Sequence, residues 1–124
     1  NAPRLLDNRL RLKADSRLRF AGQITGVEGY VESAASGWLA AWFSAAELGA
    51  RAATPPPAST AHGGLLTQLA RNEATYQPSN ITFSHLPPWD GPRLGKRPRY
   101  EAIAERALAD LARWIDAERA VAAE

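Results

Sequence analysis

The 124-residue sequence contains no cysteine and no methionine, and it has only two histidines. Without cysteine, neither a disulfide framework nor a thiolate metal site can form within these residues. His62 and His85 lie far apart without companion ligands, so we predict no metal site and expect each to be a loop or cap histidine. No apolar run approaches the roughly 20 residues that span a bilayer, which predicts no membrane partner.

The bulk composition is that of an ordinary folded protein. Hydrophobic residues make up 45% of the chain and charged residues 23%, which indicates one globular domain or a piece of a larger one. The net charge of +2 is compatible with a polyanionic partner without requiring one. Because the chain begins at Asn1 and has no methionine, we expect it to be a fragment of a longer protein.

The N-terminal third combines two strand patterns with a helix pattern. Residues 9–12 and 17–20 alternate arginine with leucine or phenylalanine, which predicts two half-buried strands. Residues 22–30 then contain three glycines, and apolar residues recur at helical spacing over residues 31–46. The broad apolar stripe predicts a helix buried over much of its circumference, which ends at Gly49.

The remaining chain predicts shorter elements and one long helix. Thr60 is a candidate N-cap for a short helix that carries Leu65, Leu66 and Leu69. Residues 80–83 favour a strand, which the prolines at 87–88 end. We expect a basic loop over residues 90–99 and a final helix with Pro98 near its start.

A strand, a glycine-rich turn and a helix in succession can bind a flat or anionic ligand. The first amides of a helix lack internal partners, and glycine lets a ligand approach the backbone closely. The turn does not have the spacing of the dinucleotide-binding fingerprint. From these residues alone, a tight connection that binds nothing is equally well supported.

Residues 20–37, FAGQITGVEGYVESAASG, resemble the late FAD-binding motif of the TrmFO family almost letter for letter. Further matches follow in that family's order: Pro55-Pro56, Thr60-Ala61, Leu65-Leu66, Tyr76-Gln77-Pro78, Asn80-Ile81, Phe83, Leu86-Pro87-Pro88, Lys96-Arg97, Arg99-Tyr100 and Arg106-Ala107-Leu108. The MnmG (GidA) family has a similar turn, in which Thr-Thr usually replaces Val27-Glu28.

The resemblance implies an α/β fold. Residues 1–52 would be the closing strand and helix of a FAD-binding, Rossmann-like domain of the glutathione-reductase type. Residues 53–124 would be the family's C-terminal segment, with a loop, a short helix, a strand, a basic loop and a final helix. The missing N-terminal portion of the same enzyme would then be a partner and would supply the expected catalytic cysteine, and the fragment alone would be inactive.

The implied activity is methylation of C5 of the T-loop uridine of tRNA in the cytoplasm. Methylenetetrahydrofolate would give the carbon, reduced FAD would be the reductant, and NAD(P)H would recharge the flavin. Two alternatives are an MnmG-like flavoprotein that modifies the wobble uridine of tRNA and a non-catalytic fragment that only binds RNA.

The resemblance also assigns site residues. Those expected to bind the cofactor are Gly22, Gln23, Ile24, Thr25, Gly26, Gly29 and Tyr30. Glu28, Glu32 and Ser33 would support folate or flavin, although carboxylates also simply favour a helix N-terminus. A basic cluster is expected to contact tRNA phosphates, or to be solvated loop charge: Arg93, Lys96, Arg97 and Arg99.

Overall fold

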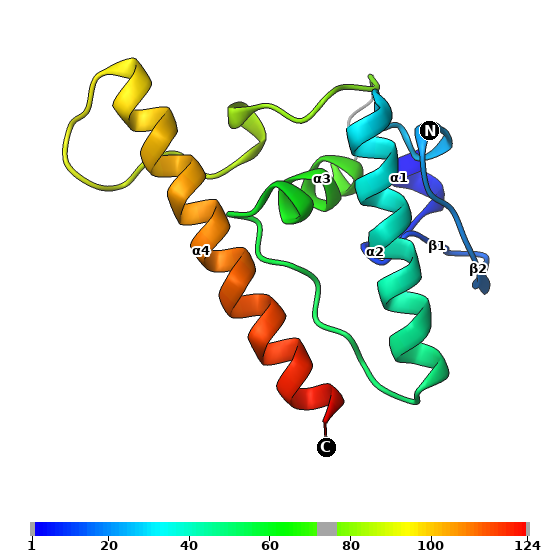
Figure 1. Ribbon diagram of the computed structural model, residues 1–124. Helices are drawn as coiled ribbons and strands as arrows, with labels where there is room; N and C mark the ends of the chain where they lie inside the picture. Colours follow the sequence, from blue (N-terminus) through cyan, green and yellow to red (C-terminus); the bar gives the residue numbers. More distant parts are fainter. Residues whose placement is uncertain (1, 72–76, 124) are drawn as a thin grey trace.

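The computed structural model describes residues 2–71 and 77–123 (Figure 1). Its elements, in chain order, are α1 (Ala2–Leu5), β1 (Arg11–Leu12), β2 (Asp15–Arg19), the 3-10 turn η1 (Gln23–Thr25), α2 (Tyr30–Leu48), α3 (Ala61–Ala70), the 3-10 turn η2 (Phe83–His85) and α4 (Lys96–Ala122). In Figure 1, α2 and α4 lie on two sides of the molecule, with α3 between them. None of the described helices combines the length and the apolar content that crossing a membrane requires.

The sheet consists of two short antiparallel strands, β1 and β2, in which Arg11 pairs with Arg19. Both alternating runs of the sequence thus contribute a strand, as predicted. Among residues 2–71 and 77–123, the one parallel pairing is the bridge between Val27 and Ser79. The described fold is therefore a mixed arrangement of helices and a small sheet, which is a coarser statement than a Rossmann-like domain.

The second strand does not face inward as its sequence pattern predicts. Leu18 is 49% exposed, whereas the side chain of Arg19 is largely covered. The Arg19 guanidinium donates hydrogen bonds to Ser44 Oγ at 2.5 Å and to Glu47 Oε1 at 2.8 Å, both on α2. These contacts bring the arginine, rather than the leucine, against the helix.

The helix α2 ends at Gly49 as predicted, but it is not buried over most of its circumference. Trp38 and Val31 are exposed. The buried residues form a single stripe at alternating steps of four and three residues: Glu32, Ser36, Leu39, Phe43 and Ala46. This spacing is that of an ordinary amphipathic helix with one face on a core.

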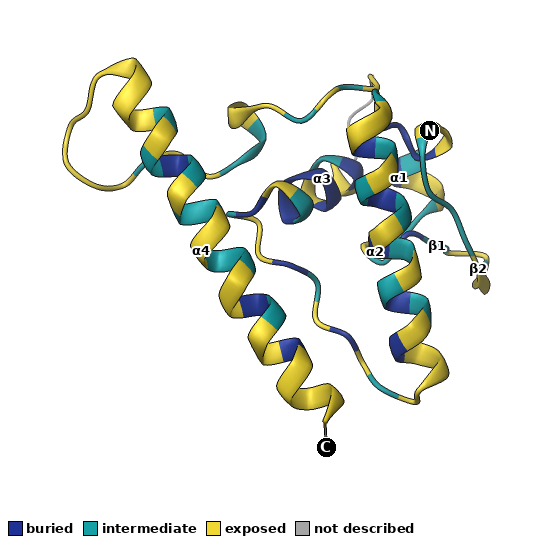
Figure 2. Cartoon of the chain, in the orientation of Figure 1, coloured by how far each residue is buried: buried dark blue, intermediate teal, exposed yellow. Residues whose placement is uncertain are grey.

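The core joins the N-terminal half of the chain to α3. Its buried members are Leu10, Val27, Leu39, Phe43, Ala46, Ala53, Leu65, Leu66 and Leu69. Figure 2 shows these buried positions as dark blue segments of α2, α3 and the connection that follows α2. Residues before and after position 52 therefore share one hydrophobic core.

The helix α3 starts as the sequence predicts, because the Thr60 hydroxyl accepts a hydrogen bond from the Gly63 amide at 3.0 Å. Glycine has a low intrinsic helix propensity, yet the packing at position 63 requires a residue without a side chain. A Cβ at Gly63 would lie 1.9 Å from the carbonyl oxygen of Pro57. The missing side chain lets the proline-rich connection pass directly over the helix.

The strand predicted at residues 80–83 is wrong, because the chain there turns into η2. The imidazole Nδ1 of His85 accepts a hydrogen bond from the Thr82 amide at 2.9 Å, and the His85 amide donates to the Thr82 carbonyl at 3.0 Å. This reciprocal cap closes the turn, which confirms the expectation that His85 is a cap histidine. Tyr76, part of the sequence motif before it, lies outside the described residues.

The helix α4 begins at Lys96, so Lys96, Arg97 and Arg99 lie in its first turn and not in the predicted loop. Few of its residues are buried, and Trp114 and Glu118 attach it to the connection that follows α2. The Trp114 indole donates to the Thr54 carbonyl at 2.9 Å. Glu118 accepts from the Thr54 amide at 3.1 Å and pairs with Arg51 at 3.1 Å.

Candidate functional site

The glycine turn, residues 22–29, takes its shape from three glycines in the left-handed region. Gly22, Gly26 and Gly29 have φ angles of 78°, 94° and 95°, which residues with a side chain rarely adopt. Between the first two, the turn η1 is closed by the Thr25 amide and hydroxyl, which donate to the Gly22 carbonyl at 2.9 and 2.7 Å. Thr25 is fully buried, so it shapes the turn from beneath.

The first turns of α2 hold the glycine turn through Ser36, a residue that the sequence analysis did not single out. Its hydroxyl accepts a hydrogen bond from the Gly22 amide at 2.8 Å and donates to the Ser33 carbonyl at 2.9 Å. A single buried serine thus links the start of the turn to the helix. The apolar pattern of the sequence indicated neither the burial of Ser36 nor its hydrogen-bond partner.

A second contact comes from residues 79–81, about fifty positions later in the chain. The Glu28 amide donates to the Ser79 carbonyl at 3.1 Å, and the Asn80 side chain donates to the Glu28 carbonyl at 2.9 Å. The Ile81 amide donates to Glu32 Oε1 at 3.0 Å. We call these three residues, 79–81, the clamp segment.

Glu32, predicted to support folate or flavin, is buried and bonded to the chain's own groups. Hydrogen bonds from its own backbone amide, from the Ile81 amide and from the Asn80 side chain hold the pKa of Glu32 below its ordinary value, although burial opposes them. The carboxylate is therefore ionised and helps to hold the clamp segment. Glu28 is exposed, and its described bonds are those of its backbone.

The surface above the glycine turn is apolar and open. Ile24 is 71% exposed and Tyr30 is 95% exposed, while a Cβ placed on Gly22 would meet no atom within 4 Å. Gly29, the N-cap of α2, has no side chain that could accept from the first amides of the helix. The turn thus presents backbone and two large side chains outward.

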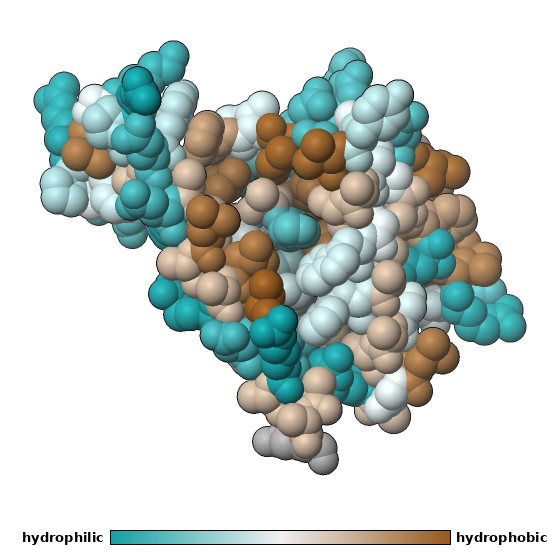
Figure 3. Space-filling model, viewed as in Figure 1, coloured by the Kyte–Doolittle hydropathy of each residue, from teal (hydrophilic) through white to brown (hydrophobic). Residues whose placement is uncertain are grey.

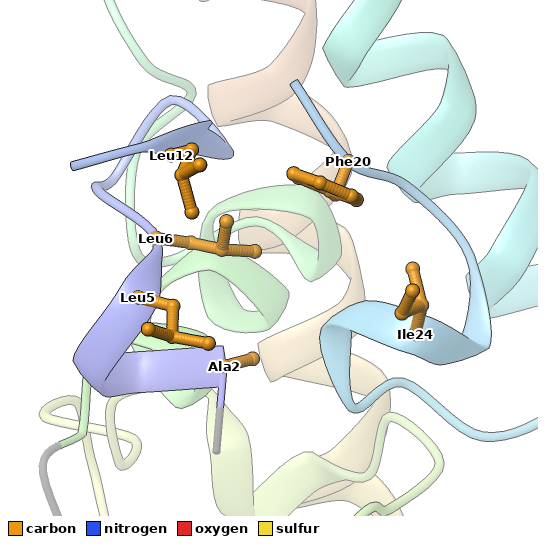
Figure 4. Close-up of a pocket in the computed structure, with 6 residues that line it drawn as sticks. All are labelled: Ala2, Leu5, Leu6, Leu12, Phe20 and Ile24. Carbon is orange, nitrogen blue, oxygen red and sulfur yellow. The ribbon is translucent and has the colours of Figure 1, made fainter. Parts of the chain in front are cut away.

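A small apolar hollow adjoins the turn. It has a volume of about 230 Å³ and lies between α1, the sheet and η1. Figure 4 shows the side chains of Leu6, Leu12, Phe20 and Ile24 around one shared space. The predicted cofactor residues thus lie in the glycine turn and at the first position of α2, and one of them, Ile24, lines the hollow.

The predicted basic cluster lies elsewhere in the structure. Arg93, Lys96, Arg97 and Arg99 are all exposed and lie at or just before the first turn of α4. In Figure 1 this end of α4 is on the opposite side of the molecule from the strands. The structure gathers these four residues with one another but not with the glycine turn.

Comparison with known proteins gives two kinds of match. Residues 1–52, which contain the sheet, the glycine turn and α2, match the family described as glucose inhibited division protein A. Nearly the whole chain also matches proteins named methylenetetrahydrofolate–tRNA-(uracil-5-)-methyltransferase TrmFO. The protein of Paracoccus denitrificans is 50% identical over an alignment of 123 residues, with 95% of this chain and 28% of the relative covered. The chain is homologous to TrmFO.

Two further TrmFO proteins match this chain with the same identity. The Phenylobacterium zucineum TrmFO is 50% identical over an alignment of 140 residues, with 100% of this chain and 30% of the relative covered. The Syntrophotalea carbinolica TrmFO is 50% identical over 115 residues, with 92% of this chain and 25% of the relative covered. The resemblance to the TrmFO family is thereby confirmed, and this chain spans less than a third of the length of the TrmFO proteins that it matches.

Proposed function

We propose that this chain is part of a flavoenzyme that methylates C5 of the T-loop uridine of tRNA, with methylenetetrahydrofolate as carbon donor and reduced FAD as reductant. The observation that carries the proposal is 50% identity to TrmFO of Paracoccus denitrificans across 95% of the chain. Because the chain spans under a third of that protein, we propose the methyltransferase activity for a whole enzyme of which this chain is a part. NAD(P)H as the source of electrons and a cytoplasmic setting are parts of the same proposal.

The finer fold is also a proposal. Residues 1–52 would close a Rossmann-like FAD-binding domain, and residues 53–124 would form the family's C-terminal segment. The family match to residues 1–52 supports this division. The shared core, with Leu39 and Phe43 of α2 beside Leu65 of α3, indicates that the two parts fold as one unit.

The glycine turn fits one edge of a flavin. A flat ring could approach the open backbone at Gly22, while the exposed Ile24 and Tyr30 would cover its apolar surface. The Glu32 amide is bonded to its own carboxylate, while the Tyr30 and Val31 amides at the start of α2 would favour negative charge on a ligand edge that faces them, by about 0.3–1 kcal/mol. When bound, FAD would supply the reducing equivalents that turn the transferred carbon into a methyl group.

The residues of this chain would act by holding that edge in place. Thr25 and Ser36 bond the Gly22 end of the turn, and the clamp segment bonds Glu28 at its other end. These contacts are all made within the chain, and they hold the turn in the shape described. The turn is therefore shaped before any ligand arrives, which lowers the cost of binding.

The basic cluster is the proposed tRNA contact of this chain. Its four cations are exposed and lie together, as phosphate-binding residues do. An MnmG-like activity is less well supported, because the matches that extend over nearly the whole chain carry the TrmFO name. The roles of Glu28, Glu32 and Ser33 toward folate remain predictions.

The proposal can be tested by exchanging a segment. The aligned part of the Paracoccus denitrificans TrmFO would be replaced by residues 1–124, and the purified hybrid would be assayed for flavin absorbance and for folate-dependent transfer of labelled carbon to tRNA. We expect a yellow, active hybrid, and much weaker flavin absorbance in the same hybrid with Gly22→Val. A folded hybrid that binds no flavin would contradict the proposal.

A further inference from the structure

An apolar groove of about 360 Å³ lies between the segment 81–86 and α4. Its walls include Ile81, Phe83 and Leu86 on one side and Ala104 and Leu108 of α4 on the other. Phe83 is 41% exposed and Leu108 is 68% exposed, so the groove opens to solvent. The space-filling view in Figure 3 shows brown apolar surface beside α4.

Phe83, which lines the groove, is stacked on a second aromatic ring. Phe83 stacks on Tyr100 of α4, with ring centroids 4.5 Å apart and planes inclined by 1°. The Arg99 guanidinium lies 5.7 Å from the Tyr100 ring centre. Aromatic and guanidinium planes are the surfaces on which unpaired bases of RNA stack.

The side of α4 that faces the groove also carries positive charge in the first turn of the helix. Lys96, Tyr100, Ala104 and Leu108 recur at four-residue steps, so they follow one side of the helix from its first turn into the groove. Within residues 2–71 and 77–123, no ion pair occupies Lys96 or Arg99, whereas Arg97 pairs with Glu101. Lys96 and Arg99 therefore lie at the start of the helix that forms one wall of the groove, where both are exposed.

We propose that this groove binds an unstacked nucleobase of an RNA loop, with the flanking phosphates on Lys96 and Arg99. The inference rests on the proposed function and deepens it, because it adds a base-binding surface to the phosphate contacts. The groove offers apolar surface to the face of a flat ring, and the exposed cations in the first turn of α4 match a polyanion. An apolar protein segment would fill the groove without using those cations.

The test is RNA binding by the 124-residue chain. Fluorescence anisotropy would compare an RNA hairpin that has a single-stranded loop with a fully paired duplex of the same length, over a range of salt concentrations. We expect Phe83→Ala to weaken hairpin binding by about 5- to 100-fold and to leave duplex binding unchanged, because stacking on one base is lost. Phe83→Trp, which keeps a flat ring, should restore binding, and Phe83→Leu should not.

A second variant separates charge from stacking. Lys96→Ala should weaken the binding of both RNAs and reduce the slope of log affinity against log salt by about one. Leu48→Ala, at an exposed apolar position at the far end of α2, is the matched control and should change neither affinity. Circular dichroism would show that each variant keeps its helices.

Three results would overturn the inference. Equal hairpin binding by all Phe83 variants would mean that only phosphates are contacted, while the methyltransferase proposal would stand on the hybrid's flavin and activity. Self-association of the chain that Phe83→Ala abolishes would assign the groove to a second copy. No RNA binding at all would also remove the proposed tRNA contact of α4, while flavin absorbance in the hybrid would be unaffected.

Discussion

The side-chain amide of Asn80 donates a hydrogen bond of 2.9 Å to the carbonyl oxygen of Glu28, 52 positions earlier in the chain. This bond joins the clamp segment to the residue just before the N-cap of α2. Together with the Ser79 and Ile81 contacts, it ties the C-terminal part of the chain to the glycine turn. A change in the clamp segment should therefore alter the turn.

Gly29→Ala should destabilise the fold by roughly 1–3 kcal/mol or more. Its φ is 95°, and an added Cβ would lie 2.5 Å from Glu32 Oε2 and 2.6 Å from Asn80 Nδ2. Gly37→Ala is the matched control, because Gly37 lies inside α2 with nothing within 4 Å, and it should stabilise by about 0.5–1 kcal/mol. Urea unfolding measures both, and equal effects would contradict the close packing at Gly29.

Glu32→Gln should reduce the loss of stability in acid. The pKa of Glu32 is held below its ordinary 4.5 in the fold, so the folded state binds fewer protons than the unfolded chain in that range. Its contribution is complete above pH 4.5 and is lost as the pH falls through the lowered pKa. Gln keeps the oxygen that accepts from Ile81 but does not titrate.

The measurement for Glu32 is the difference between the free energies of unfolding at about pH 7 and about pH 3, in both proteins. Asp7, Asp15 and Asp110 also have lowered pKa values, so the variant should keep part of the acid sensitivity. An unchanged difference would show that Glu32 is not bonded as described.

Glu118→Ala should destabilise the protein by roughly 3–5 kcal/mol, because it leaves the Arg51 cation and the Thr54 amide without their buried partner. Glu101→Ala removes an exposed acid from the same helix and should cost less than about 1 kcal/mol. Thermal unfolding followed by tryptophan fluorescence compares the two. Similar losses would mean that Glu118 does not anchor α4.

Phe43→Ala should cost about 3–5 kcal/mol, since Phe43 is fully buried in the core between α2 and α3. Leu48 lies further along the same helix at an exposed position, so Leu48→Ala should change stability by no more than about 0.5 kcal/mol. Chemical denaturation of both variants gives the comparison. A small loss of stability in Phe43→Ala would show that Phe43 is not a central residue of the core.

The elements that the sequence predicts well are determined by residues that lie close together in the chain. Thr60 caps α3 through an amide three residues away, and Gly49 ends α2 in the position where the apolar pattern stops. The errors come from distant contacts. Arg19 lies against α2 because Ser44 and Glu47 bind it, and no alternation within β2 contains that information.

The features of the candidate site also fall into those that follow from neighbouring residues and those that depend on distant contacts. The glycine turn, its neighbours and the resemblance to TrmFO follow from consecutive residues, because positive φ angles and a helix start are local properties of the chain. The tertiary structure alone decided that Asn80 and Ser36 hold the turn, that Glu32 is buried, and that Phe83 stacks on Tyr100. Hydrogen bonds and packing between distant residues depend on how the chain closes on itself, and no local spacing records that closure.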